Sequence, residues 1–148
     1  MGELTHRVVA CTYVFRGDKM LLLKRATRPF TLAPPGGRLE PLEDPFAGAL
    51  REVREESGLE VEIFGVAQAW FGSFVPGAFP ILSINYLARS DAGTPRLSDE
   101  HTEYVWVTRK MIESREIETQ DEQGSGFSRE SILDAFERYE AWMTVGKL

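Results

Sequence analysis

Residues 34 to 59 read PPGGRLEPLEDPFAGALREVREESGL, and this stretch decides the prediction of the fold. It opens with two prolines and two glycines, which predict a rigid, tight loop. Asp44 and Pro45 then provide an N-cap followed by proline at the first helical position. Gly58 predicts the end of this helix. The stretch is therefore predicted to form a loop, a helix over about residues 45 to 57, and a second loop.

The predicted helix has two distinct faces. At about 100° per residue, Phe46, Leu50 and Val53 fall within a narrow arc, which we expect to pack on a sheet. The other face carries three glutamates at spacings i, i+3 and i+4, namely Glu52, Glu55 and Glu56. Like charges at these spacings repel each other by a few tenths of a kcal/mol per pair, roughly. Mg²⁺ would relieve this repulsion, because it prefers carboxylate oxygens.

Two interpretations of the acidic face stay open at this point. It is either a solvated surface relieved by Arg51 and Arg54, or a metal site. The surroundings favour the metal site, because the Gly36-Gly37 loop just upstream lets backbone approach a ligand closely. Glu43 precedes the helix near its positive end and could add a further oxygen.

The rest of the chain alternates strands and helices without regular strand–helix–strand units, which predicts a mixed sheet with helices packed on it. The expected strands are residues 6–15, 20–23, 61–74 (interrupted), 80–89 and 104–107. A short helix is expected over 108–114. Ser128 is predicted to cap a last helix, in which apolar residues recur at helical spacing.

Composition bounds the class of protein. A chain of 148 residues, 43% of them hydrophobic, is expected to form one domain over residues 1–148. The net charge of −6 disfavours general binding to nucleic acid, because an acidic surface repels a phosphate backbone. No apolar run approaches the roughly 20 residues of a membrane span, and the first residues are too polar for a signal peptide. With its single cysteine, the chain is expected to be cytoplasmic.

The stretch from residue 37 to 59 resembles the Nudix box: Gly, five residues, Glu, seven residues, then Arg-Glu-apolar-x-Glu-Glu-x-Gly-apolar. Every fixed position is matched, by Gly37, Glu43, Arg51, Glu52, Val53, Glu55, Glu56, Gly58 and Leu59. The likeness extends over about residues 6 to 110, although Leu42 stands where members often carry glycine. It implies an α/β fold, an α/β/α sandwich around a mixed sheet with a loop–helix–loop catalytic motif.

The resemblance also implies the chemistry of the box. Glu52, Glu55 and Glu56 would bind Mg²⁺ or Mn²⁺, with backbone from Gly37 and support or direct ligation from Glu43. Arg51 would orient a box carboxylate from outside the metal shell. Glu56 is the first choice for the general base that activates water. Glu100 and Glu103, from a connection that could reach the site, are the alternatives.

The resemblance further implies hydrolysis of a pyrophosphate linkage in a nucleoside diphosphate derivative. Nucleoside triphosphates, giving a monophosphate and pyrophosphate, are the first expectation. ADP-ribose or nucleotide sugars are the alternative, and a non-catalytic nucleotide sensor is a weaker one because no box glutamate is missing. Residues expected to contact the small-molecule substrate are Arg25, Arg28, Arg38 and Phe74. A homodimer is also compatible with the resemblance, with the last helix as a candidate interface.

Overall fold

One mixed sheet organises the computed structural model, which describes residues 6–146. Within this range the sheet has seven strands, five of them in the order β3-β2-β1-β6-β5, while β4 pairs with β1 and β7 pairs with β2. The strands are β1 (Arg7–Arg16), β2 (Lys19–Arg25), β3 (Leu32–Ala33), β4 (Gly36–Arg38), β5 (Glu62–Gly72), β6 (Ile81–Arg89) and β7 (His101–Thr108). The helices are α1 (Pro45–Ser57), α2 (Arg109–Glu113) and α3 (Arg129–Val145). The parallel β1–β6 pair makes the sheet mixed, as predicted.

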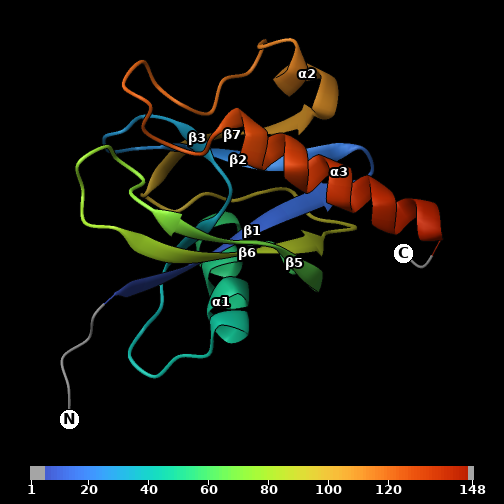
Figure 1. Ribbon diagram of the computed structural model, residues 1–148. Helices are drawn as coiled ribbons and strands as arrows, with labels where there is room; N and C mark the ends of the chain where they lie inside the picture. Colours follow the sequence, from blue (N-terminus) through green and yellow to red (C-terminus); the bar gives the residue numbers. More distant parts are fainter. Residues whose placement is uncertain (1–5, 147–148) are drawn as a thin grey trace.

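The two long helices cover opposite faces of the sheet (Figure 1). Side chains alternate along β1 between these faces, as the strand period of two requires. Tyr13 and Phe15 pack with α3, where the ring of Phe15 stacks on Tyr139 at 4.0 Å. Val14 points the other way and packs with Val53 of α1. The expected sandwich, with the loop–helix–loop on one side, is confirmed.

The sheet opens between β1 and β2, and this opening positions the loop before α1. The two strands pair only next to their hairpin, at Phe15↔Met20 and Arg16↔Lys19. Further from the hairpin, β1 pairs instead with β4, with Ala10 opposite Gly37 and Cys11 opposite Gly36. Alternation along β4 therefore turns Gly37 toward α1 and Gly36 toward the α3 side.

Several element boundaries differ from the prediction. The segment expected as an interrupted strand is one continuous strand, β5, whose pairing with β6 shifts register twice. These irregularities account for the broken pattern in the sequence, because each extra residue disturbs the alternation. The short strands β3 and β4 were not predicted, since two or three residues are too few to show a strand period.

The ends of α1 lie where its capping residues predict. The Asp44 side chain accepts a hydrogen bond from Ala47 N–H at 3.1 Å, and Gly58 adopts the left-handed conformation that ends the helix. The predicted packing face is only partly correct, because Val53 is buried and Leu50 half-buried. Phe46 is exposed, and the buried stripe is Ala49, Glu52, Val53 and Glu56, a face rotated by roughly 75° from the expected one. Two box glutamates therefore point into the protein.

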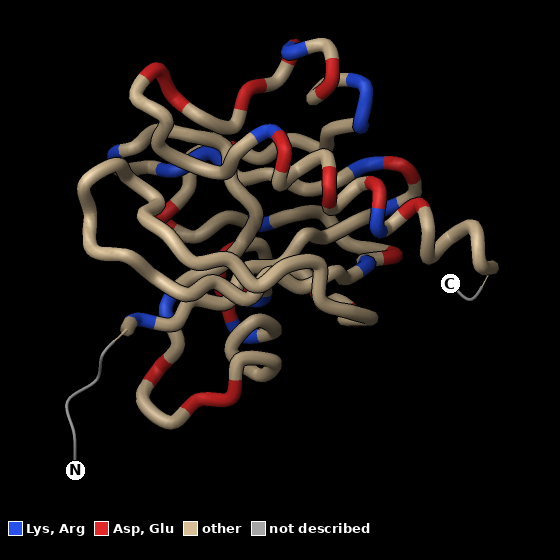
Figure 2. The backbone as a smooth tube through the Cα atoms, viewed as in Figure 1, with Lys and Arg blue, Asp and Glu red and all other residues tan. Residues whose placement is uncertain are grey.

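Charge is distributed without a dominant basic face. Figure 2 shows Lys and Arg interspersed with Asp and Glu along the chain, with acidic residues in the loop that leads into α1. None of the helices within residues 6–146 has both the length and the apolar character needed to cross a membrane.

Replacing Leu42 with glycine is expected to stabilise the protein modestly. Leu42 has a φ of 63° and its side chain is fully exposed, so the residue adopts a strained conformation without gaining packing. Relief of strain of roughly 1–2 kcal/mol exceeds the roughly 0.5–1 kcal/mol of backbone entropy that glycine loses. Urea unfolding measures the difference. Leu42→Ala, which keeps the strain, should bring no gain, and a destabilised Leu42→Gly variant would contradict the explanation.

Candidate active site

The buried face of α1 presents two carboxylates to the Gly36-Gly37 backbone. The Gly36 N–H donates a hydrogen bond to Glu56 Oε1 at 2.8 Å. Gly37 approaches Glu52 so closely that a Cβ at this position would lie 2.8 Å from Glu52 Oε1. Neither glycine has a positive φ, so close approach rather than backbone conformation requires glycine here. The loop and the helix thus form one cluster of carboxylates and backbone.

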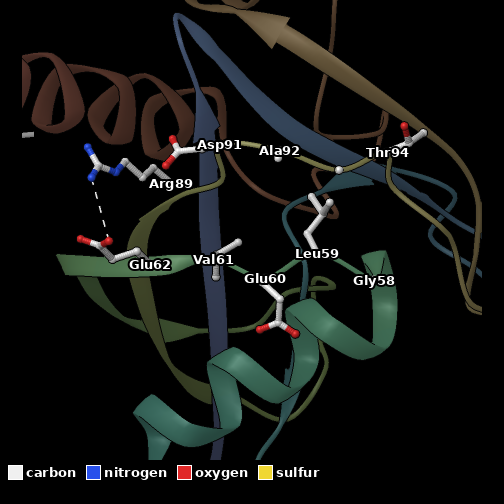
Figure 3. Close-up of a pocket in the computed structure, with 10 residues that line it drawn as sticks. Gly58, Leu59, Glu60, Val61, Glu62, Arg89, Asp91, Ala92 and Thr94 are labelled. Atoms are coloured by element: carbon white, nitrogen blue, oxygen red, sulfur yellow. Dashed lines mark ion pairs between the residues drawn. The ribbon is translucent and has the colours of Figure 1, made fainter.

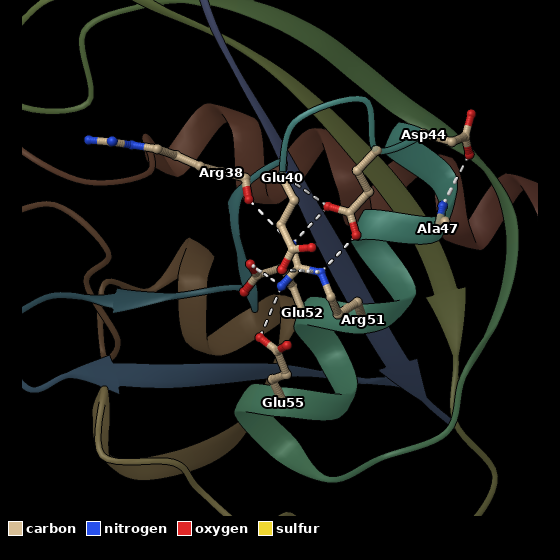
Figure 4. A network of polar contacts seen from close by, with 8 residues as sticks. Arg38, Glu40, Asp44, Ala47, Arg51, Glu52 and Glu55 are labelled. Carbon is tan, nitrogen blue, oxygen red and sulfur yellow. Dashed lines mark hydrogen bonds and ion pairs between the residues drawn. The ribbon is translucent and has the colours of Figure 1, made fainter.

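Arg51 links four acceptors of this region (Figure 4). Its guanidinium holds Glu43 through a fork, with Nε 2.7 Å from Oε2 and Nη2 2.9 Å from Oε1. Nη1 donates to Glu52 Oε1 and to Glu55 Oε2, both at 3.0 Å, and Nη2 also donates to the Arg38 carbonyl at 3.4 Å. The planar guanidinium therefore fixes the loop before α1 and two box carboxylates at once.

The electrostatics separate the glutamates into two groups. Burial, together with the neighbouring Glu52 and Glu100 charges, raises the pKa of Glu56 to about 8, although the Gly36 N–H opposes this change. Burial also raises the pKa of Glu52, while Arg51 opposes it. By contrast, the fork from Arg51 lowers the pKa of Glu43 to about 2. Glu43 is therefore ionised and paired with Arg51. Glu52 and Glu56 are instead crowded carboxylates with too little positive charge beside them.

Glu100 completes the cluster from the opposite side of the opening. Its carboxyl group hydrogen-bonds with Glu56 and contributes to the raised pKa of both Glu52 and Glu56. The Glu100 carbonyl accepts a hydrogen bond from Ala26 N–H at 2.9 Å, which ties this residue to the end of β2. Glu103 is exposed on β7 and lies across from Lys24. The structure therefore favours Glu100 over Glu103 as the acidic partner of Glu56.

A model of the NUDIX domain matches residues 4–130 of the chain. The chain belongs to the Nudix family. As a Nudix hydrolase it is a pyrophosphohydrolase, and enzymes of this family act on nucleotide substrates. The loop–helix–loop with Gly37, Arg51, Glu52 and Glu56 is its Nudix box.

Known proteins support the assignment at two levels. A MutT-like protein of Streptomyces ambofaciens is 32% identical over 113 residues, which cover 76% of this chain and 71% of that protein. Among solved structures, an Ap4A hydrolase of C. elegans superposes with a TM-score of 0.73 at 19% identity, covering 93% of this chain and 98% of that one. An ADP-ribose pyrophosphatase of Streptococcus suis gives 0.71 at 19% identity, covering 91% and 92%. The structural matches show the shared Nudix fold.

The donor set of the Nudix box suits a hard divalent cation, of the kind on which the family typically depends. Carboxylate oxygens are the ligands that Mg²⁺ prefers, and a cation would relieve the crowding that raises the pKa of Glu52 and Glu56. Within residues 6–146 no three acidic, His or Cys side chains yet converge closely enough to hold an ion. Arg51 holds Glu55 on the exposed side of α1, so the chemistry fits while the ligand sphere is not closed.

The predicted substrate-binding residues are not brought together equally. Arg25 is used within its own loop, because its Nε donates to the Pro29 carbonyl at 3.0 Å and its guanidinium lies 5.5 Å from the Phe74 ring centre. Phe74 packs against Phe127 at 5.9 Å. The Arg28 guanidinium lies over Phe30. Arg38 is exposed, and its side chain extends away from the Arg51 network (Figure 4). Of these four residues, Arg38 is therefore the one best available to a ligand.

A groove away from the box carboxylates lies beside the end of the Nudix box. It has a volume of about 520 Å³ and lies beyond the C-terminal end of α1, between residues 58–62 and 89–94 (Figure 3). Its charged lining includes Glu60, Glu62 and Asp91, and none of the box carboxylates reaches it. We place the chemistry at the carboxylate cluster, because the groove contains none of the box carboxylates.

Replacing Arg51 with lysine is expected to lower turnover by about 10- to 100-fold, the usual cost of losing a residue that orients metal ligands. A lysine ammonium cannot hold Glu43 through a fork and also reach Glu52 and Glu55. Steady-state kinetics at saturating Mg²⁺ measure the loss, and circular dichroism checks the fold. Arg54→Lys is the matched control, because Arg54 pairs only with the exposed Glu60. Wild-type turnover in Arg51→Lys would contradict the orienting role.

Proposed function

We propose that the protein hydrolyses a nucleoside triphosphate to the monophosphate and pyrophosphate, with Mg²⁺ as its cation and Mn²⁺ as a substitute. The main support is the position of Glu56 and Glu52 against the backbone of Gly36 and Gly37, with Glu100 beside Glu56. Of these three carboxylates, Glu52 alone has a described cationic partner, Arg51, so the group suits a cation that also neutralises a polyphosphate.

Glu52, Glu56 and Glu100 would hold the cation, and Glu55 is the remaining ligand that the box predicts. When bound, the cation polarises the phosphate and offsets the negative charge that develops on it. The chain supplies the rest of the reaction. Gly36 and Gly37 admit the phosphate chain close to the backbone, because neither carries a Cβ.

Proton transfer falls to the Glu56–Glu100 pair. With a pKa of about 8, Glu56 is mostly protonated near neutral pH in the metal-free protein, and its ionised form is the one that accepts a proton. The attacking water gives its proton to this pair as its oxygen bonds to phosphorus, and the P–O bond that joins the monophosphate to the pyrophosphate breaks. Arg51 keeps Glu52 in place throughout this step. No covalent enzyme intermediate is required.

One feature supports a triphosphate as the substrate. Arg38 directly follows the glycine loop, is exposed, and makes no ion pair with any described residue, so it is available for a terminal phosphate.

A substrate panel tests the proposal. Purified protein is incubated with Mg²⁺ and nucleoside triphosphates, ADP-ribose, nucleotide sugars or diadenosine tetraphosphate, and the products are separated by chromatography. We expect the triphosphates to be cleaved fastest, to monophosphate and pyrophosphate. Faster cleavage of another class would replace the triphosphate with that class. Nucleotide binding without turnover of any compound would overturn hydrolysis and favour a sensor.

A further inference from the structure

Trp70 stands on the face of the sheet that α3 only partly covers. Strand register places it in a row across four strands, in which Arg38 pairs with Val9, Val9 with Ser83, and Ser83 with Trp70. Residues paired across strands share a face, so the indole and the Arg38 side chain are on the same side. Gln68, two residues earlier on β5, contacts the Ser131 carbonyl of α3, which identifies that side as the α3 face.

The indole of Trp70 lies against the strand at Gly72. A Cβ added to Gly72 would come within 2.7 and 2.9 Å of two ring carbons of Trp70, and its three nearest neighbours are all atoms of that ring. Gly72 has no positive φ, so backbone conformation does not require glycine there. Glycine is favoured there because the Trp70 ring occupies the space that a Cβ would need. Trp70 is nevertheless 38% exposed, so an indole seated on the backbone keeps part of its surface open.

The other aromatic residues nearby do not offer an equivalent surface. The ring of Phe74 is covered by the Arg25 guanidinium and by Phe127. Phe71 is 58% exposed, but it follows Trp70 directly on the strand and therefore points to the opposite face, where it contacts His6. Trp70 is thus the exposed strand aromatic that shares a face and a row with Arg38.

We propose that the indole of Trp70 is the surface on which the substrate's nucleobase stacks, while the polyphosphate runs past Arg38 to the carboxylate cluster. The inference rests on the proposed nucleotide substrate and assigns the binding surface of its nucleobase. Three interstrand spacings, roughly 14 Å, separate the strands of Trp70 and Arg38. An extended nucleoside triphosphate bridges this span. Trp70 takes the role that the sequence predicts for Phe74.

A purely structural role for the ring makes a different prediction. Aromatic side chains also shield exposed glycine backbone in edge strands, and β5 is at the edge of the sheet. In that case Trp70→Ala would lower the melting temperature and leave substrate affinity unchanged. The stacking role predicts instead that substrate affinity falls while the melting temperature changes little. The base loses its stacking partner, whereas the strand stays paired with β6.

Kinetics of three variants separate the two roles. We expect Trp70→Ala to raise KM for the preferred nucleotide by about 5- to 150-fold, the equivalent of 1–3 kcal/mol per stacked base, with little change in kcat. Trp70→Phe should recover most of the affinity. Phe71→Ala is the matched control, since the same strand then loses an exposed aromatic ring from the opposite face. Equal KM values for Trp70→Ala and the wild type would overturn the proposal.

A binding measurement makes the test independent of turnover. A non-hydrolysable nucleoside triphosphate analogue should quench tryptophan fluorescence in the wild type. It should not do so in Trp70→Phe, which keeps Trp106 and Trp142. Inorganic tripolyphosphate, which has no base, should quench neither. If the wild type hydrolyses nothing but Trp70-dependent quenching is present, the proposed reaction fails and the base site stands. If hydrolysis occurs and the analogue quenches the fluorescence of Trp70→Phe as much as that of the wild type, the nucleobase site is wrong and the proposed reaction stands.

Discussion

Glu56→Gln is expected to reduce nucleotide hydrolysis by about 10²- to 10⁴-fold, the range that a positioned acid–base group contributes. The amide keeps an oxygen for the Gly36 N–H, so the glycine loop should stay in place. It cannot accept the proton of the attacking water. Turnover with saturating Mg²⁺ measures the loss. Glu60→Gln is the control, because Glu60 is exposed and pairs only with Arg54. Unchanged turnover in Glu56→Gln would remove this residue from the reaction.

The same substitution is expected to stabilise the metal-free protein at alkaline pH. The pKa of Glu56 is about 8 in the folded protein and 4.5 in its ordinary state, so the folded chain holds this proton more tightly. The contribution of the protonated Glu56 carboxyl to the free energy of unfolding is therefore greatest below pH 4.5. It is lost as the pH rises to about 8. The loss is on the order of 3–5 kcal/mol. Urea unfolding in EDTA should show a falling stability in the wild type and a flatter profile in Glu56→Gln; parallel profiles would contradict the burial argument.

Glu100→Gln and Glu103→Gln are expected to differ sharply. Glu100 hydrogen-bonds with Glu56, so its loss should lower turnover by about 10²-fold or more. Glu103 is exposed on β7, and its loss should have little effect. The two residues are three positions apart with the same side chain, so each variant controls for the other in the same kinetic assay. A larger loss in Glu103→Gln would restore the role that the family resemblance predicts for it.

Local chemistry made α1 predictable. Its caps depend on Asp44, Pro45 and Gly58 alone, and both ends lie where these residues predict. The face that it buries was not predictable from hydrophobicity. Glu52 and Glu56 occupy the buried stripe, while Phe46 stays exposed. A site that gathers carboxylates against backbone violates the rule that charged residues face water, and for that reason the pattern predicted only part of the buried face.

The role of Glu100 depended on information that the sequence does not carry. Its approach to Glu56 follows from the opening between β1 and β2, which exists because β1 exchanges β2 for β4 beyond the hairpin. Two-residue pairings and short strands leave no periodic signal. Similarly, the seat of Trp70 on Gly72 depends on strand register, and β5 shifts register twice. The identity of the box was thus predictable, but the partners supplied by distant segments were not.

Calorimetric titration of Mg²⁺ into the purified protein, in two buffers of different ionisation enthalpy, tests the central claim that these crowded carboxylates form a cation site. At pH 7 we expect Mg²⁺ to bind with release of protons, because the cation displaces the proton held by Glu56. The release should decline at pH 9, where this proton is already lost. Glu56→Gln should bind more weakly and release fewer protons. Absence of Mg²⁺ binding, or binding that is identical in Glu56→Gln, would show that these carboxylates do not form the cation site.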